Sequence, residues 1–180
     1  MKRVTSAVVG LILFSVSSAG QSPAAGQKLN LATSLQRAYA TTKENLTKAA
    51  EKMPEADYGF KPGTHADLRT YGALIGHQAD NQFIHCAALK GVPNPNAAQA
   101  NEKKATKATK AEMIKTLADA FAFCDSAIAA LTDQNALQMI KSAEGETARG
   151  AVVSTLLSHG HGSENVAAVY LLAKGIARPW

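Results

Sequence analysis

Apolar residues recur at helical spacing in four separate parts of the 180-residue chain, and this pattern constrains the fold more than any other feature. Alanine is abundant and aromatic residues make up only 6% of the chain, which favours helices packed through small side chains over a sheet. We therefore predict one all-α domain, a four-helix bundle, over residues 29–180. Its helices are predicted over residues 29–53, 64–89, 110–131 and 147–174.

Local signals refine these boundaries. Two Thr-x-x-acid capping boxes, at residues 64–67 and 109–112, predict the starts of the second and third helices. Residues 91–108 hold two prolines and have a weak hydrophobic pattern, so they form a long crossover between these two helices. A second connector, residues 133–146, is predicted to hold one helical turn around residues 137–140.

The first residues have the pattern of a secretory signal peptide. A basic start, Lys2 and Arg3, precedes an apolar run over residues 8–14 that is too short to span a bilayer. Small residues at Ser17 and Ala19 fit a cleavage site. We predict a signal peptide at 1–19, a flexible leader at 20–28 and a periplasmic or secreted protein without membrane contact after cleavage, with a retained anchor as the alternative.

The charge of the chain gives no indication of a nucleic-acid partner. Cleavage would remove two cations from a chain whose formal net charge is +5. Four lysines cluster between residues 103 and 110, but no aromatic residues are interleaved with them. This composition is typical of a solvated linker, so we expect no nucleic-acid binding.

The two cysteines, Cys86 and Cys124, fall on the predicted second and third helices. An exported protein meets an oxidising environment, so an even cysteine count favours a disulfide between them, with two buried free thiols as the alternative. Their distances from the helix ends fit a bridge better if the two helices run parallel. Parallel neighbours need a crossover, and residues 91–108 are long enough to supply one.

Of the five histidines in the chain, His77 in the second helix is the most informative. It lies at the centre of that helix, in register with the apolar stripe, and Asn81 and His85 follow one and two turns later. These polar groups are predicted to face the bundle interior. A single histidine on such a face is more often a hydrogen-bonded core residue than a ligand, so a second segment is needed to decide.

That second segment lies within the fourth helix. His159 and Ser163 are four residues apart and share one helix face, whereas His161 is rotated by about 200° from His159. Gly160 and Gly162 each cost about 1 kcal/mol relative to alanine inside a helix, which indicates close helix contact, a kink or access to a cavity. Bundle metal sites are commonly built from facing helices, so His77 and His159 are predicted to approach one another.

Three segments together resemble the DinB-like family of helical bundles, which includes metal-dependent thiol transferases. They are residues 50–62 (AEKMPEADYGFKP), 69–80 (RTYGALIGHQAD) and 170–179 (YLLAKGIARP). The resemblance covers nearly all of the predicted mature chain. It implies a divalent metal, zinc or nickel, held by one histidine of the second helix and a His-x-x-x-His pair of the fourth.

In this chain the three metal positions fall on His77, His159 and Ser163. A neutral serine hydroxyl is a poor ligand for borderline metals, so the implied site lacks one strong donor. A distorted helix would let His161 enter the site, and Glu164 is the other candidate to replace the missing imidazole.

Three functions stay open on the sequence alone. The resemblance implies a divalent-metal-dependent hydrolase or transferase with a degenerate site. The alternatives are a non-catalytic module that binds an unknown small molecule, and a structural bundle that forms a homodimer. The sequence has no phosphate loop, nucleophile elbow or zincin motif. The pocket residues expected beside His77 and His159 are Tyr71, Asn81, His161, Glu164 and Tyr170.

Overall fold

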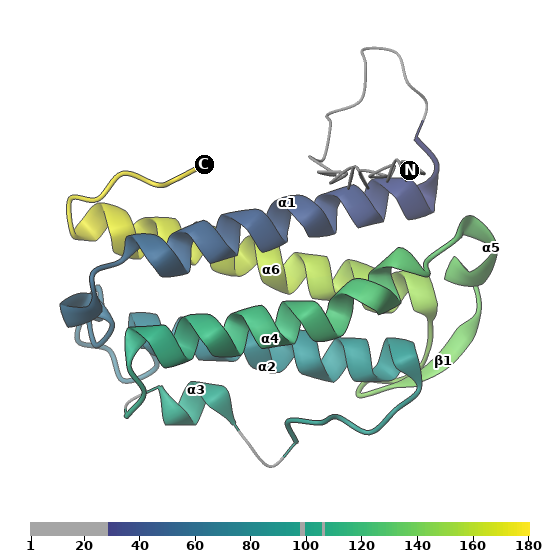
Figure 1. Cartoon of the computed structure of the whole chain (residues 1–180), viewed down its shortest axis with the longest axis horizontal. Helices are drawn as coiled ribbons and strands as arrows, with labels where there is room; N and C mark the ends of the chain where they lie inside the picture. The colour runs from purple at the N-terminus through teal and green to yellow at the C-terminus, as the bar shows by residue number, and fades with distance from the viewer. Residues whose placement is uncertain (1–28, 98–99, 106) are drawn as a thin grey trace, which may run out of the picture.

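Four long helices form the bundle in the computed structural model, which describes residues 29–97, 100–105 and 107–180. The signal peptide and leader predicted at 1–28 lie outside the described residues. Figure 1 shows α1 and α6 running in one direction and α2 and α4 in the other. The four helices are α1 (Leu31–Lys52), α2 (Tyr71–Lys90), α4 (Lys110–Ala129) and α6 (Arg149–Ala173).

Short elements occupy the connections. A 3-10 turn, η1 (Glu55–Asp57), follows α1, and α3 (Asn101–Lys104) lies in the crossover. After α4 come α5 (Asp133–Ala136) and a hairpin of β1 (Met139–Ser142) and β2 (Gly145–Ala148). In the described part of the chain, no helix combines the length and hydropathy that a membrane span requires.

The start of α4 confirms one predicted capping box, and the start of α2 contradicts the other. Thr109 and Glu112 bond each other's backbone amides as predicted. The box at residues 64–67 was wrong, because α2 begins at Tyr71 with Thr70 as its cap. The carbonyls of Phe60 and Tyr58 accept from the amides of Tyr71 and Gly72, at 3.0 and 2.8 Å. Tertiary partners thus hold the first turn of α2, and residues 64–67 stay irregular.

The core lies between the four helices and consists mainly of apolar side chains. Tyr58 and Tyr71 anchor the segment after α1, since their hydroxyls donate to the Ala50 and Ala49 carbonyls at 2.5 and 2.7 Å. Where α6 meets α1, the Cβ of an alanine at position 160 would lie 2.4 Å from Thr42 Cγ2. Gly160 therefore marks a close contact between α6 and α1, one of the three readings expected for this glycine.

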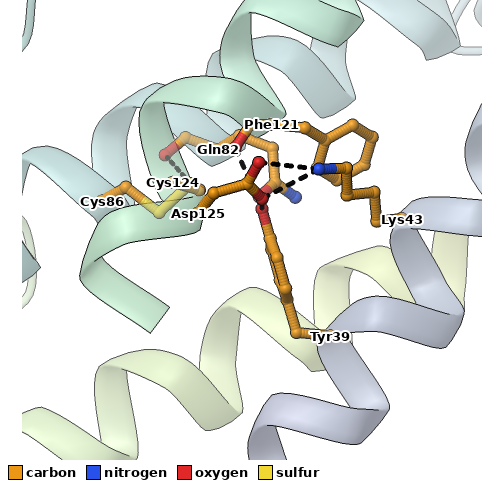
Figure 2. Close-up of a disulfide and its surroundings, with 7 residues drawn as sticks. All are labelled: Tyr39, Lys43, Gln82, Cys86, Phe121, Cys124 and Asp125. Carbon is orange, nitrogen blue, oxygen red and sulfur yellow. Dashed lines mark hydrogen bonds and ion pairs between the residues drawn. A yellow bond between two sulfur atoms is a disulfide. The ribbon is translucent and has the colours of Figure 1, made fainter. Parts of the chain in front are cut away.

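The predicted disulfide between Cys86 and Cys124 is confirmed and joins α2 to α4, with a Cα–Cα distance of 5.2 Å (Figure 2). The two helices are parallel, as the positions of the cysteines predicted. In Figure 2, Tyr39 and Lys43 reach from α1 to Asp125 on α4, and Lys43 Nζ lies 2.8 Å from Asp125 Oδ2. Covalent and ionic links therefore tie α4 to two neighbouring helices.

The long crossover is confirmed, and it passes very close to α2 at Gly76. A Cβ at this position would lie 2.6 Å from the Asn101 carbonyl carbon and oxygen, so only glycine allows this approach. Asp80 completes the contact, because its carboxylate accepts from the backbone amides of Asn101 and Glu102, each at 3.1 Å. These contacts hold the Glu102 side chain beside His77 on α2.

The second connector differs from the prediction. The helical turn expected around residues 137–140 was wrong, since α5 ends at Ala136 and Met139 already pairs with Ala148 in the hairpin. Gly145, with φ of 110°, allows the tight turn. Four-residue strands are too short for a period-two pattern to be distinguished from a helical turn.

Candidate functional site

Polar side chains of α2 and α6 meet across one face of the bundle. The Gln78 amide nitrogen donates to Ser163 Oγ at 2.6 Å and lies 3.2 Å from the His159 carbonyl oxygen. Gln78 is fully buried and Ser163 is 7% exposed. The helix turns that carry His77 and His159 are therefore adjacent, which was the arrangement expected from the sequence.

His77 is held on both ring nitrogens. Its Nδ1 lies 3.1 Å from Glu102 Oε2, and its Nε2 lies 3.1 Å from the Asn81 amide nitrogen. A carboxylate only accepts hydrogen bonds, so Nδ1 carries the proton and Nε2 has the lone pair that Asn81 contacts. Arg69 donates to the other oxygen of Glu102 at 2.8 Å.

The surroundings of His77 favour the neutral ring. Burial lowers the pKa of His77, the Arg69 charge lowers it further, and Glu102 acts in the opposite direction. A histidine with a lowered pKa is uncharged at neutral pH. His77 therefore presents a neutral imidazole whose tautomer is set by Glu102.

His159 and His85 form a second histidine contact on the same face. Their ring centroids are 5.7 Å apart, and His159 Nδ1 lies 3.0 Å from the Thr155 carbonyl oxygen. Burial lowers the pKa of His85, and the charge of nearby His159 adds to the effect. His85 thus continues the polar row that the spacing of His77 and Asn81 predicted.

A cavity of about 260 Å³ opens at the end of this face nearest the start of α2. Tyr170 closes one side, since its hydroxyl donates to the Arg69 carbonyl at 2.6 Å. Of the predicted site residues, His77, Ser163 and Tyr170 line it. The full lining is Asp67, Leu68, Arg69, Leu74, His77, Ser163, Val166 and Tyr170. We call this cavity, with its lining, the α2–α6 groove.

The other predicted residues lie elsewhere. Tyr71 is fully buried and packs against Tyr170 with ring centroids 5.9 Å apart, so it supports the groove from the core. Glu164 faces α1, where Asn45 donates to its Oε2 at 3.3 Å. His161 is exposed on the outside of α6.

The two charged residues around His77 were missed by sequence reasoning, as was Gln78, which bonds Ser163. Arg69 belongs to an irregular segment, and Glu102 lies in the crossover, 25 positions after the histidine it contacts. Glu102 carried no local signal. The Arg69 position was within a family-like segment, but its ion pair with Glu102 depends on the approach of α3 to Gly76.

The donors at the implied metal position do not fit a resident zinc or nickel ion. Within the described residues, no group of three histidine, cysteine, aspartate or glutamate side chains is arranged to hold a metal. Ser163 occupies the third position with a neutral hydroxyl that already accepts from Gln78. Zinc sites in proteins use at least three imidazole, thiolate or carboxylate ligands.

Comparison with known proteins gives the family. A model of the DinB superfamily matches residues 38–161, which is more than half of the chain. The chain belongs to the DinB superfamily. In this DinB bundle, the α2–α6 groove has Ser163 at the position where the family resemblance implies a third metal ligand. A search of curated proteins finds no match.

Solved structures share the fold of this DinB bundle at low sequence identity. A conserved protein from Enterococcus faecalis is 14% identical with a TM-score of 0.64, over 82% of this chain and 99% of that one. A mycothiol-dependent maleylpyruvate isomerase is 16% identical with a TM-score of 0.58, over 77% of this chain. A mutant of that isomerase gives 15% and 0.59 over the same 77%. The DinB bundle spans 60% of the isomerase in both cases.

Proposed function

We propose that this protein binds a small organic molecule in the α2–α6 groove, and that Arg69 and Ser163 supply the polar contacts. The observation that carries the proposal is a cavity of about 260 Å³ that combines apolar walls with a few fixed polar groups. Ligand sites in proteins have this composition, and their volumes begin at roughly 300 Å³. A volume of about 260 Å³ lies just below that range, so it suits only a small molecule.

The polar groups favour a ligand with a carbonyl or carboxylate. Ser163 Oγ accepts from Gln78, which leaves its own hydroxyl hydrogen to donate. Glu102 engages two of the three guanidinium nitrogens of Arg69, and that side chain is 42% exposed. Both residues therefore have donors for a ligand oxygen. The isomerase among the structural neighbours acts, by its name, on a small organic acid, which agrees with this ligand class.

A metal-dependent hydrolase or transferase is the second candidate, and one observation favours it. Glu102 and the Thr155 carbonyl bind the Nδ1 atoms of His77 and His159, which makes Nε2 the lone-pair nitrogen on both rings. On His77 the Asn81 amide would have to give up this nitrogen to a metal. Metal-binding histidines typically donate the N–H of the other ring nitrogen to a carboxylate or a backbone carbonyl in this way. Two such ligands would hold zinc or nickel weakly and would need a third donor from the substrate.

Export and oligomeric state are part of the proposal. A buried disulfide in a small bundle supports a periplasmic or secreted location, where disulfides persist. Whether the protein is a monomer or a homodimer is measured directly by light scattering.

The test of the ligand proposal is NMR titration of the purified protein with acetate, pyruvate, maleate and benzoate. We expect at least one carboxylate to shift the amide signals of residues 74–81 and 160–166. Ser163→Ala should weaken that binding about fivefold, the loss of about one hydrogen bond. His161→Ala is the matched control, because it alters an exposed residue of the same helix. The proposal is wrong if none of the four probes binds, or if both variants weaken binding equally.

Calorimetry with zinc and nickel tests the second candidate on the same variants. Metal binding that is lost in both His77→Ala and His159→Ala, but kept in Ser163→Ala, would support it. Unchanged metal binding in the two histidine variants would remove it.

A further inference from the structure

A second cavity lies at the other end of α2, where the β1–β2 hairpin packs beside the helix terminus (Figure 1). Its volume is about 460 Å³. Position 89 is twelve residues after His77, or about 18 Å along the helix axis, so this cavity is separate from the α2–α6 groove. Its main lining residues are Leu89, Lys90, Val92, Ile140, Lys141 and Arg149. We call it the hairpin pocket.

The charged groups of the hairpin pocket are all cationic. Lys90 comes from α2, Lys141 from β1 and Arg149 from the start of α6, and none of the described lining residues is acidic. Glu146 stands opposite Lys141 in the hairpin, is exposed and does not line the pocket. Three elements thus contribute cationic residues to the lining of one cavity. Fixed cations that converge on a concave site favour an anionic ligand.

Arg149 is built into the wall of this pocket. One terminal nitrogen donates to the Leu89 carbonyl at 2.6 Å, and the other lies 3.3 Å from Gln138 Oε1. Its Nε is buried and has no hydrogen-bond partner among the described residues. Because Nε is closed off from solvent, a ligand in the pocket would meet the positive charge of the guanidinium group and not this nitrogen.

Lys90 is oriented by an aromatic ring. Its ammonium lies 4.0 Å from the centroid of Phe123, a cation–π contact that positions the charged end without taking up all three of its N–H donors. Lys141 is exposed at the rim. The lysines can therefore contact a ligand without breaking an ion pair that the fold requires.

The rest of the wall is apolar. Leu89 is 4% exposed, whereas Val92 is 45% exposed at the mouth, and Ile140 is half-buried on the hairpin. Apolar surface beside cationic groups matches a molecule with a hydrocarbon part and one acidic end. Inorganic anions would use only the cations and leave the apolar wall in water.

We propose that the hairpin pocket binds a small amphiphilic carboxylate, with Lys90, Lys141 and Arg149 around the acid group and Leu89, Val92 and Ile140 against the hydrocarbon part. This site does not depend on the function proposed for the α2–α6 groove.

The experiment is an NMR titration of the whole protein with hexanoate, with hexylammonium and inorganic phosphate as comparison probes. We expect hexanoate to shift the amide signals of residues 87–92, 140–141 and 149–150. Hexylammonium has the same hydrocarbon part without the negative charge, and phosphate has the charge without the hydrocarbon part. Both should bind about tenfold or more weakly than hexanoate.

Variants test the cations directly. The double variant Lys90→Gln with Lys141→Gln should weaken hexanoate binding about tenfold, while Lys61→Gln, an exposed lysine of the loop before α2, should change it by less than about twofold. Arg149 is left intact because it bonds the end of α2. Ser163→Ala should leave hexanoate binding at residues 87–92 unchanged, which separates this site from the groove.

Three results would overturn the proposal. Hexanoate shifts confined to residues 74–81 and 160–166 would place the ligand in the groove instead. Equal binding by the double variant and the wild type would remove the role of the lysines. Equal binding of hexanoate and either comparison probe would show that charge and hydrocarbon part are not recognised together.

Discussion

Glu102 controls the charge and hydrogen bonding of His77. Its carboxylate contacts Nδ1 of the ring, and its other oxygen binds Arg69. Burial and the Arg69 charge lower the pKa of His77, and Glu102 is the group that opposes them most. Removing the negative charge while keeping the side-chain size should therefore lower the pKa of His77 further.

The predicted result for Glu102→Gln is a lower pKa of His77, measured by NMR titration of the imidazole signals. Glu144→Gln is the matched variant, because the Glu144 charge raises the pKa of His85. It should lower the pKa of His85 and leave that of His77 in place. A His77 pKa that is unchanged or raised in Glu102→Gln would contradict the pairing of the two side chains.

Alanine substitutions of Gly160 and Gly162 test how closely α6 is packed at two single positions. Alanine at 160 would place its Cβ 2.4 Å from the buried Thr42 side chain, whereas at 162 it would meet nothing within 4 Å. Overpacking of this kind costs about 1–3 kcal/mol, while replacing glycine by alanine at an open helix position gains up to about 1 kcal/mol.

We therefore expect Gly160→Ala to lower the free energy of unfolding and Gly162→Ala to raise it, both measured by urea denaturation. Changes of the same sign in the two variants would show that the contact between α6 and α1 is looser than described.

Among the elements, α2 depends most on its surroundings. Its cap is Thr70, whose hydroxyl oxygen accepts from the Ala73 amide at 3.1 Å. The first two amides of the helix donate to carbonyls of the preceding segment. The sequence predicted Thr64 instead, because the capping pattern of residues 64–67 is complete there.

Thr70→Ala should destabilise the protein by about 1 kcal/mol, the usual effect of losing a helix cap. Thr64→Ala should have almost no effect, since Thr64 is exposed in the irregular segment before α2. Thermal unfolding of the two variants beside the wild type gives the comparison. Greater destabilisation by Thr64→Ala would show that the helix begins earlier.

The stability of the whole molecule should depend on pH through two histidines. Burial lowers the pKa of both His77 and His85 below their ordinary value of 6.5. Between that value and the lower folded pKa, the unfolded chain binds more protons than the folded one. Protonation then favours unfolding, so the free energy of unfolding is highest above about pH 6.5 and falls as the pH drops below it.

We expect the denaturation midpoint to decrease between about pH 7.5 and about pH 5, and a double variant with glutamine at positions 77 and 85 to show a smaller decrease. His161→Ala should keep the wild-type pH dependence, because that side chain is exposed. A midpoint that rises as the pH falls would contradict the sign of both shifts.

Much of the molecule followed from local patterns. Apolar spacing indicated the four long helices, and the capping box at Thr109 gave the start of α4. Cys86 and Cys124 predicted both the disulfide and the parallel course of α2 and α4. Helical spacing also identified the polar row that begins at His77, because residues four apart share a face.

Tertiary contact decided the rest. Glu102 reaches His77 only because Gly76 lets the crossover approach α2, and no local pattern couples positions 25 residues apart. The hairpin pocket likewise forms only where the end of α2, the start of α6 and the β1–β2 hairpin meet. Periodicity and capping arise from interactions within a few residues, so the amino-acid sequence by itself determined the four long helices, but not the residue at which α2 begins. The charges and cavities arise from distant segments, so they were decided only when the bundle packed together.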